Sequence, residues 1–245
     1  ILPLSASAWM SPLICSGGGQ SAAGCSTPTG NVLSESFGDC ASGCSACYSG
    51  GVEACENTWT VSGDSATFQH ALQAGMPTGS CTYGLLSDTE DAAENKERVY
   101  WDNGSPVAYD TNDVDIEFSF YLNSATITNY GSIYLISWAS NNNGSYNYAF
   151  AFVVFNNNGT LQIWITSGAD PTKTNISVET WYTINIHLDA TAASSYYTVN
   201  GGSQNSFTRH DVSGQYFIIG SLYGQDDEEN ISFEVGYAKI NATAQ

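Results

Sequence analysis

Three carboxylates at alternate positions of one short segment are the residues of this chain whose spacing could support chemistry. Asp113, Asp115 and Glu117 share one parity. The residues of the other parity are all apolar: Val114, Ile116, Phe118, Phe120 and Leu122. Because successive side chains of a β-strand point to opposite faces, the pattern predicts a strand with one hydrophobic and one acidic face. A bound cation, a shared proton or solvent must offset the repulsion between these carboxylates, and the sequence leaves the three open.

The charge balance limits the partners of this chain. Five Lys and Arg residues stand against 24 Asp and Glu residues, for a net charge of −19. Such a chain repels phosphate backbones and anionic membrane surfaces, so we expect no nucleic-acid partner. It also has no apolar run long enough to insert into a membrane. The composition fits a secreted protein, and Ca²⁺, which binds oxygen ligands, is the one candidate cofactor; its ligands are not assigned.

The cysteines all lie in the first third of the chain: Cys15, Cys25, Cys40, Cys44, Cys47, Cys55 and Cys81. No histidine falls among the closely spaced ones, and Gly, Ser and Ala fill the spacers. This favours a disulfide framework over a zinc site. Because seven is odd, one thiol is left for a free cysteine or for a bridge to another chain.

Asn-x-Ser/Thr sequons also indicate an extracellular glycoprotein. They occur at Asn103, Asn143, Asn158, Asn175, Asn230 and Asn241. Asn143 and Asn158 fall in expected hairpin turns, where a glycan can project freely.

Three regions follow from the composition. Residues 1–14 are apolar, residues 15–56 form a loop-rich subregion held by disulfides, and residues 57–245 form the main domain.

Short strands with polar turns predict an all-β fold, a two-sheet antiparallel β-sandwich of jelly-roll type. Residues 87–98 are either a short helix or an acidic loop. The expected strands are 57–62, 66–72, 81–86, 113–122, 131–138, 146–155, 160–166, 179–188, 195–200, 215–222 and 231–240.

Two further sets of side chains have alternative interpretations. Trp101, Trp138 and Trp164 could stack on sugar rings, but packing in or beside the core is the simpler expectation. The histidines, His70, His187 and His210, have no metal-binding or triad spacing. His187 shares its parity with Asn185 and Asp189, so we expect it at the surface rather than as a ligand.

The C-terminal half resembles the concanavalin A-like lectin and glucanase superfamily, which includes laminin-G-like modules. Its members have a Trp-led strand, then a strand that ends in a Tyr-x-Val-Asp/Asn-Gly hairpin, then a late strand with Ile-Gly. The matching positions here are Trp181, Tyr197, Val199, Asn200, Gly201, Ile219 and Gly220. The resemblance covers residues 57–240 and implies a jelly roll, which supports the fold more than any function.

A second resemblance is local. Residues 113–118, DVDIEF, are similar to the E-[IL]-D-[IF]-E-F strand of family 16 glycoside hydrolases. In that family the first carboxylate is the nucleophile, the second tunes it and the third is the general acid/base. The resemblance therefore implies Asp113, Asp115 and Glu117 as catalytic residues, if the chain is an enzyme, with Asp113 where the family has Glu.

Together these observations predict a secreted glycoprotein with a non-catalytic structural or adhesive role. The apolar residues 1–14, the odd cysteine and the Tyr- and Asn-rich strands favour self-assembly. In this hypothesis residues 1–14 of one copy add to the sandwich of the next, which gives a head-to-tail filament. The expected partners are other copies of the chain and glycans. A retaining β-glucan hydrolase and a Ca²⁺-dependent lectin remain as alternatives.

Overall fold

A computed structural model of the chain describes residues 29–35, 48–49, 52–53, 57, 59–62, 67–71, 83–88, 98–127, 132–142, 147–166, 173–191, 195–220 and 230–245. These residues form strands and their connections, with no helix among them that could span a membrane. The strands are β1 (Leu33–Glu35), β2 (Tyr48–Ser49), β3 (Val52–Glu53), β4 (Thr60–Ser62), β5 (Thr67–Ala71), β6 (Tyr83–Asp88), β7 (Arg98–Val107), β8 (Asn112–Thr126), β9 (Ser132–Ala139), β10 (Tyr148–Asn157), β11 (Thr160–Thr166), β12 (Thr174–Asn175), β13 (Trp181–Leu188), β14 (Tyr196–Val199), β15 (Asn205–Ser206), β16 (Gly214–Gly220) and β17 (Asn230–Ala244).

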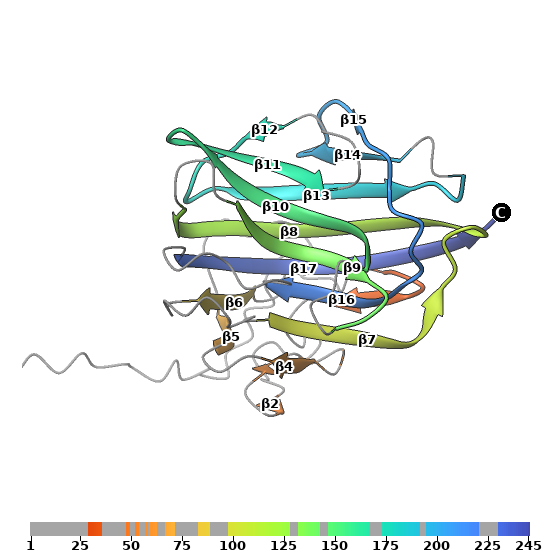
Figure 1. Cartoon of the computed structure of the whole chain (residues 1–245). Coiled ribbons are helices and arrows are strands. Elements are labelled where there is room, and N and C mark those ends of the chain that lie inside the picture. The colour runs from red at the N-terminus through yellow and green to blue at the C-terminus, as the bar shows by residue number, and fades with distance from the viewer. Residues whose placement is uncertain are drawn as a thin grey trace, which may run out of the picture.

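Two antiparallel sheets form the body of the molecule (Figure 1). The eight-stranded sheet has the order β15-β14-β13-β8-β17-β6-β5, with β1 added on β17. The seven-stranded sheet has the order β12-β11-β10-β9-β16-β7-β4. Strands β2 and β3 form a separate hairpin. Consecutive strands such as β9, β10 and β11 lie side by side, whereas β8 and β17, and β7 and β16, are neighbours that are far apart in sequence, as in a jelly roll.

Aromatic side chains fill the space between the two sheets. Phe118 and Phe120 of β8 lie with their ring centroids 5.3 and 5.4 Å from that of Phe152 on β10. Phe118 also lies 6.5 Å from Phe217 of β16. All four rings are fully buried. Burial of this apolar surface holds the sheets face to face, since each large side chain contributes about 1.5–3 kcal/mol.

Strand β8 has the two faces that its alternation predicts. The apolar parity, Val114, Ile116, Phe118, Phe120 and Leu122, is at most 4 % exposed. The carboxylate parity faces outward, where Asp115 is exposed and Asp113 and Glu117 are half-buried. The expected all-β, two-sheet fold is therefore confirmed, and the acidic residues lie on the outer surface of the eight-stranded sheet.

The predicted hairpin at residues 157–159 is also present. Asn158 and Gly159 have φ angles of 50° and 91° between β10 and β11. Left-handed backbone at both central residues is the conformation that Asn-Gly favours in a two-residue hairpin.

Strand β7 was missed, because Asn103, Gly104 and Pro106 interrupt its apolar alternation. It nevertheless pairs with β16 along most of its length.

The N-terminal subregion contributes to the main sheet. Strand β1 lies within residues 15–56, yet it pairs with β17, and Leu33 is buried in the core. Buried Glu35 accepts hydrogen bonds from Trp59 Nε1 at 2.8 Å and Asn57 Nδ2 at 3.0 Å. The apolar segment 1–14, all seven cysteines and residues 89–97 lie outside the described residues, so the disulfide framework stays a prediction.

Candidate functional site

The outer face of the eight-stranded sheet arranges polar side chains in rows across three strands. In one row, Asn185 of β13, Glu117 of β8 and Lys239 of β17 lie opposite one another. In the next row, His187, Asp115 and Asn241 do the same. Directly paired residues of adjacent strands share a face, so these side chains form one continuous polar surface.

Asp115 and His187 form a hydrogen-bonded pair. Nδ1 of His187 lies 2.8 Å from Oδ1 of Asp115. Because an ionised carboxylate only accepts hydrogen bonds, this contact assigns the proton of the imidazole to Nδ1. The other side of the imidazole is bounded by Tyr196 of β14, whose ring stacks at 5.1 Å with an interplanar angle of 26°. The Asp115 side chain is 60 % exposed and so still offers acceptor positions to a ligand.

Glu117 is held from two directions. Lys239 Nζ lies 3.1 Å from Oε2, and the Tyr237 hydroxyl donates to Oε1 at 2.6 Å. Burial, together with this hydrogen bond and the nearby carboxylate charge, raises the pKa of Tyr237 far above its usual value. Tyr237 therefore keeps its proton and acts as a donor, not as a base.

Asp113 lies at the end of the polar surface and is engaged by the backbone. Its Oδ1 accepts from the Ala190 amide at 2.9 Å, and its Oδ2 accepts from the side chain of Gln245. Asp189 lies nearby, and hydrogen bonds from the Thr191 hydroxyl and amide lower its pKa below the usual range. Ligand atoms of Asp113, Asp189 and His187 all lie within 4.8 Å of one another, so these residues are the candidate cation ligands among those described.

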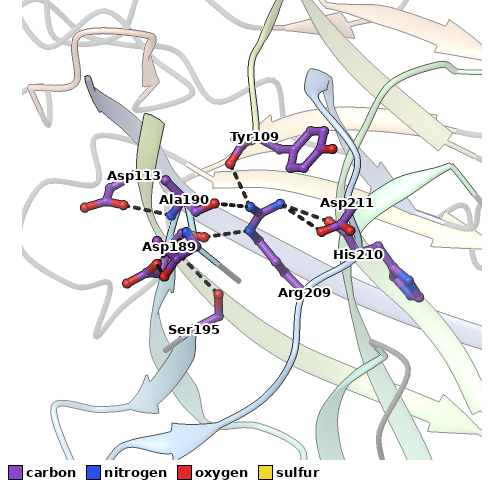
Figure 2. Close-up of polar contacts among 9 residues, drawn as sticks. Tyr109, Asp113, Asp189, Ala190, Ser195, Arg209, His210 and Asp211 are labelled. Carbon is purple, nitrogen blue, oxygen red and sulfur yellow. Dashed lines mark hydrogen bonds and ion pairs between the residues drawn. The ribbon is translucent and has the colours of Figure 1, made fainter. Parts of the chain in front are cut away.

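Arg209 fixes the loop that carries Asp189 and Ala190 (Figure 2). This guanidinium is 4 % exposed and donates to four backbone carbonyls: Asp189 at 2.7 Å, Ala190 at 2.9 Å, Tyr109 at 2.7 Å and His210 at 3.2 Å. It also lies 4.8 Å from the Tyr109 ring centroid. Because its donors serve the backbone, Arg209 positions the end of the polar surface without lending it an accessible positive charge.

The rows enclose a hollow that we name the acidic groove, defined by Asp115, Glu117, Asn185, His187, Tyr196, Lys239 and Asn241. Backbone of Ile116 and Ile186 completes its lining. Its volume is about 280 Å³. That is near the lower end of the roughly 300–1,000 Å³ typical of ligand pockets. Carboxylate, ammonium, amide and phenol groups therefore converge on a space in which a small ligand or a short stretch of polymer can lie.

The tryptophans proposed for sugar stacking lie elsewhere. Trp138 is 1 % exposed in the core, so its ring is closed to a sugar; the core-packing interpretation holds for it. Trp101 is half-buried against the same core. Trp164 lies on the outer side of the seven-stranded sheet, where Lys173 Nζ approaches its ring centroid at 4.7 Å. None of the three lines the acidic groove.

Five of the six sequon asparagines lie in described residues. Asn158 and Asn175 are exposed, Asn103 and Asn241 are half-buried, and Asn230 begins β17. Asn143 and the side chain of His70 lie outside the part of the chain that the structure describes. Glycosylation of these residues stays a prediction.

His187 was expected at the surface, and it lies half-buried on the outer face, in contact with Asp115. Sequence reasoning did not connect Tyr196, Lys239 or Asn241 with the carboxylates. The parity shared by Asn185, His187 and Asp189 was the available signal. It could not show which strand lies beside β13.

No family model matches this chain, and no curated protein matches its sequence. Solved structures of similar fold include a sialidase (TM-score 0.51, 10 % identity, 74 % of this chain and 16 % of that chain). Another is a carbohydrate esterase from the Shiga toxin-encoding bacteriophage phi24B (TM-score 0.50, 13 % identity, 76 % and 90 %). A third is a marine alginate lyase from Zobellia galactanivorans (TM-score 0.49, 11 % identity, 76 % and 96 %). At these identities the likeness shows the fold alone, a β-jelly roll.

Proposed function

We propose that this chain is a glycan-binding protein and that the acidic groove holds the saccharide. The observation that carries the proposal is the groove itself, a hollow of about 280 Å³ where polar groups of four strands converge on an outer sheet face. Sugar hydroxyls both donate and accept hydrogen bonds. The groove offers both kinds of partner, through the amides of Asn185 and Asn241 and through Asp115 and Lys239. The carbohydrate-related names of the sialidase and the esterase fit this proposal.

Binding without hydrolysis is the reading that the contacts support best. A retaining glycosidase needs one carboxylate free to attack and one free to donate a proton, about 5–5.5 Å apart. Here Glu117 is engaged by Lys239 and Tyr237, and Asp113 by Ala190 and Gln245. Neither is available for such a role without breaking these contacts. If the chain is nevertheless a β-glucan hydrolase, the wild type releases reducing sugar from β-glucans and Glu117→Gln abolishes that release.

The binding test uses an array of neutral, amino and acidic glycans, followed by calorimetry on the best ligand. Asn185→Ala removes an amide from the groove and should weaken binding about tenfold, since 1.4 kcal/mol corresponds to a factor of ten. The matched control is Asn157→Ala, an exposed position in the β10–β11 hairpin on the other sheet, which should bind as the wild type does. Absence of binding across the array, or equal loss in both variants, would remove the groove as a saccharide site.

A Ca²⁺-dependent lectin is the second candidate, and the closeness of Asp113, His187 and Asp189 favours it. Two carboxylates could bind Ca²⁺, but the imidazole in this set suits zinc or another transition metal better. If the site needs a metal, EDTA lowers the melting temperature and releases bound glycan, and only the metal concerned restores both. Unchanged melting and binding after chelation would exclude this version.

The structural role in an extracellular filament is a separate proposal that rests on the sequence. Residues 1–14 are apolar and are the segment that would add to a neighbouring copy. Light scattering and electron microscopy of the full chain and of a chain without residues 1–14 test it. Assemblies formed only by the full chain are expected, and identical particles from both would contradict the role of this segment.

A further inference from the structure

The acidic groove has an excess of negative charge, and this limits which glycans it can hold. Lys239 lies 3.1 Å from Glu117, so the two charges compensate each other. Asp115, 60 % exposed, has His187 as its partner at 2.8 Å, and this imidazole offsets at most one negative charge even when it is protonated. Asp113 and Asp189 do not line the groove, but they lie close to His187 and add two more carboxylates beside it. The surface therefore presents uncompensated carboxylates to a ligand.

Arg209, whose guanidinium Figure 2 shows beside Asp189, cannot reach a ligand. Arg209 is 4 % exposed, and its donors are used by the backbone carbonyls that it contacts. Asp211, the carboxylate that lies within ion-pair distance of Arg209 in the described part of the chain, is 3.9 Å away and 71 % exposed, on the side of the guanidinium away from Asp113 and Asp189. Arg209 thus shapes the loop at Asp189 without making the groove attractive to an anion.

The charge of the whole chain acts in the same direction. A net charge of −19 repels a polyanion before contact, and a polyuronate would then have to place carboxylates beside Asp115. Within about 8 Å, the screening length at physiological salt, this repulsion is only weakly reduced. The net charge of the chain therefore repels a glycan of acidic sugars before contact, and the carboxylates of the groove repel it again when it binds.

An ammonium group on a sugar, unlike a carboxylate, is attracted by the negative charge of the groove. It carries one positive charge and three N–H donors, and charge-assisted hydrogen bonds to carboxylates are about twice as strong as neutral ones. For N–H···O bonds of about 2.9 Å, the acceptors around a tetrahedral nitrogen lie about 4.7 Å apart. Carboxylate oxygens of Asp113 and Asp189 lie within 4.8 Å of each other, a separation that one ammonium nitrogen can span, and Asp115 lies beside them, hydrogen-bonded to His187.

From the groove and its charges we infer that this site selects glycans that carry free amino groups, such as N-deacetylated hexosamine polymers. The inference rests on the proposed glycan-binding function and specifies its ligand class. Asp115 is the principal acceptor for the ammonium group, and the Glu117–Lys239 pair, Asn185 and Asn241 face the sugar hydroxyls.

The test compares β-1,4-linked hexamers of glucosamine, N-acetylglucosamine and glucose, with a polyuronate hexamer as the anionic member. Calorimetry is done on the full chain at pH 5.5, where amines are protonated and Asp is ionised. We expect the glucosamine hexamer to bind at least tenfold more tightly than the acetylated one. We also expect its advantage to fall with added salt, and the polyuronate not to bind.

Asp115→Asn keeps the shape of the side chain and should remove the advantage of the glucosamine hexamer. Glu179→Gln is the matched control, because it also removes one negative charge but lies in the exposed turn before β13. It should leave the preference intact, and far-UV circular dichroism verifies the folding of both variants. An equal loss in the two variants would mean that the ligand responds only to overall charge, which overturns the site.

The outcomes separate this inference from the proposed function. If the neutral hexamers bind as tightly as glucosamine, or the polyuronate binds more tightly, the glycan function stands and the amino-sugar selectivity is wrong. If binding requires a divalent cation, the carboxylates hold a metal and the inference is equally wrong. If none of the hexamers binds and the glycan array is also blank, the proposed function itself falls.

Discussion

At the scale of single residues, Arg209 is a buried charged side chain whose hydrogen-bonding needs are met by backbone carbonyls. A buried guanidinium needs partners for its five donors, and here they are carbonyls from the loops before β8 and after β13 and from its own segment. A lysine has one nitrogen and cannot serve acceptors in so many directions. The residue therefore ties three segments together at the end of the acidic groove.

Arg209→Met should lower the free energy of unfolding by about 3 kcal/mol. The methionine fills a similar space but leaves the carbonyls of Tyr109, Asp189 and Ala190 without their donor. Urea denaturation followed by fluorescence measures the change. The control Asp211→Asn alters only the exposed partner 3.9 Å away and should stay within about 0.5 kcal/mol of the wild type. Equal stability of Arg209→Met and wild type would show that the loops do not depend on this residue.

The buried carboxyl group of Glu234 should make the stability of the folded protein depend on pH. It is 3 % exposed, and burial raises its pKa above the usual value of about 4.3, although Asn123 Nδ2 donates to it at 2.8 Å. The folded state then holds this proton more tightly than the unfolded state. Its contribution to stability is complete below the ordinary pKa and is lost as pH rises through the raised one.

Glu234→Gln should therefore gain stability relative to the wild type as the pH rises from 4 to 7. The neutral amide has nearly the same shape and keeps an oxygen for Asn123. Urea midpoints of both proteins, measured at several pH values, give the difference. A difference that does not change with pH would show that Glu234 titrates as it does in the unfolded chain.

At the scale of elements, β8 and β17 form the centre of the eight-stranded sheet. They pair over most of their fifteen residues each, and β13 lies on the other side of β8. This order places Lys239 and Asn241 on one side of the carboxylates and Asn185 and His187 on the other. The acidic groove is therefore a product of strand order, with each strand contributing every second residue.

Strand β16 begins at a position where packing leaves no room for a side chain. A Cβ on buried Gly214 would lie 1.8 Å from Nε1 of Trp138. Gly214→Ala should lower stability by about 1–3 kcal/mol, because the indole is buried and cannot move aside freely. Thermal unfolding followed by tryptophan fluorescence measures it. The control Gly202→Ala meets only the Val199 carbonyl at 3.1 Å and should change stability by less than about 1 kcal/mol. A smaller effect at Gly214 than at Gly202 would contradict the packing.

At the scale of the whole molecule, the net charge of −19 opposes the compact state through self-repulsion. Raising sodium chloride from 10 to 300 mM shortens the screening length and should raise the melting temperature by several degrees. Calorimetry measures the shift. Choline chloride at the same ionic strength should act in the same way, since no specific sodium site is required. A melting temperature that falls with salt would show that attractive ion pairs, such as Glu117–Lys239, outweigh the repulsion.

Most of the fold could be predicted, because the alternation of polar and apolar residues is a local property. The segments 113–122, 146–155 and 179–188 each predicted a strand that is present as β8, β10 and β13. The interrupted alternation of β7 and the very short strands β12 and β15 gave no such signal. Whether Trp138 lies in the core depends on which strands pack around it. The sequence therefore also allowed a sugar-stacking role for Trp138, and only its burial excluded that role.

By itself, the sequence determined which residues of each strand share a face, and hence that Asp113, Asp115 and Glu117 would lie together outside the core. Only the tertiary structure decided what lies beside them. His187 is 72 residues from Asp115 in the chain, and Tyr237 is 120 residues from Glu117. Their contacts depend on strand order and register, which arise from the packing of the entire sandwich and not from the alternation within any one strand.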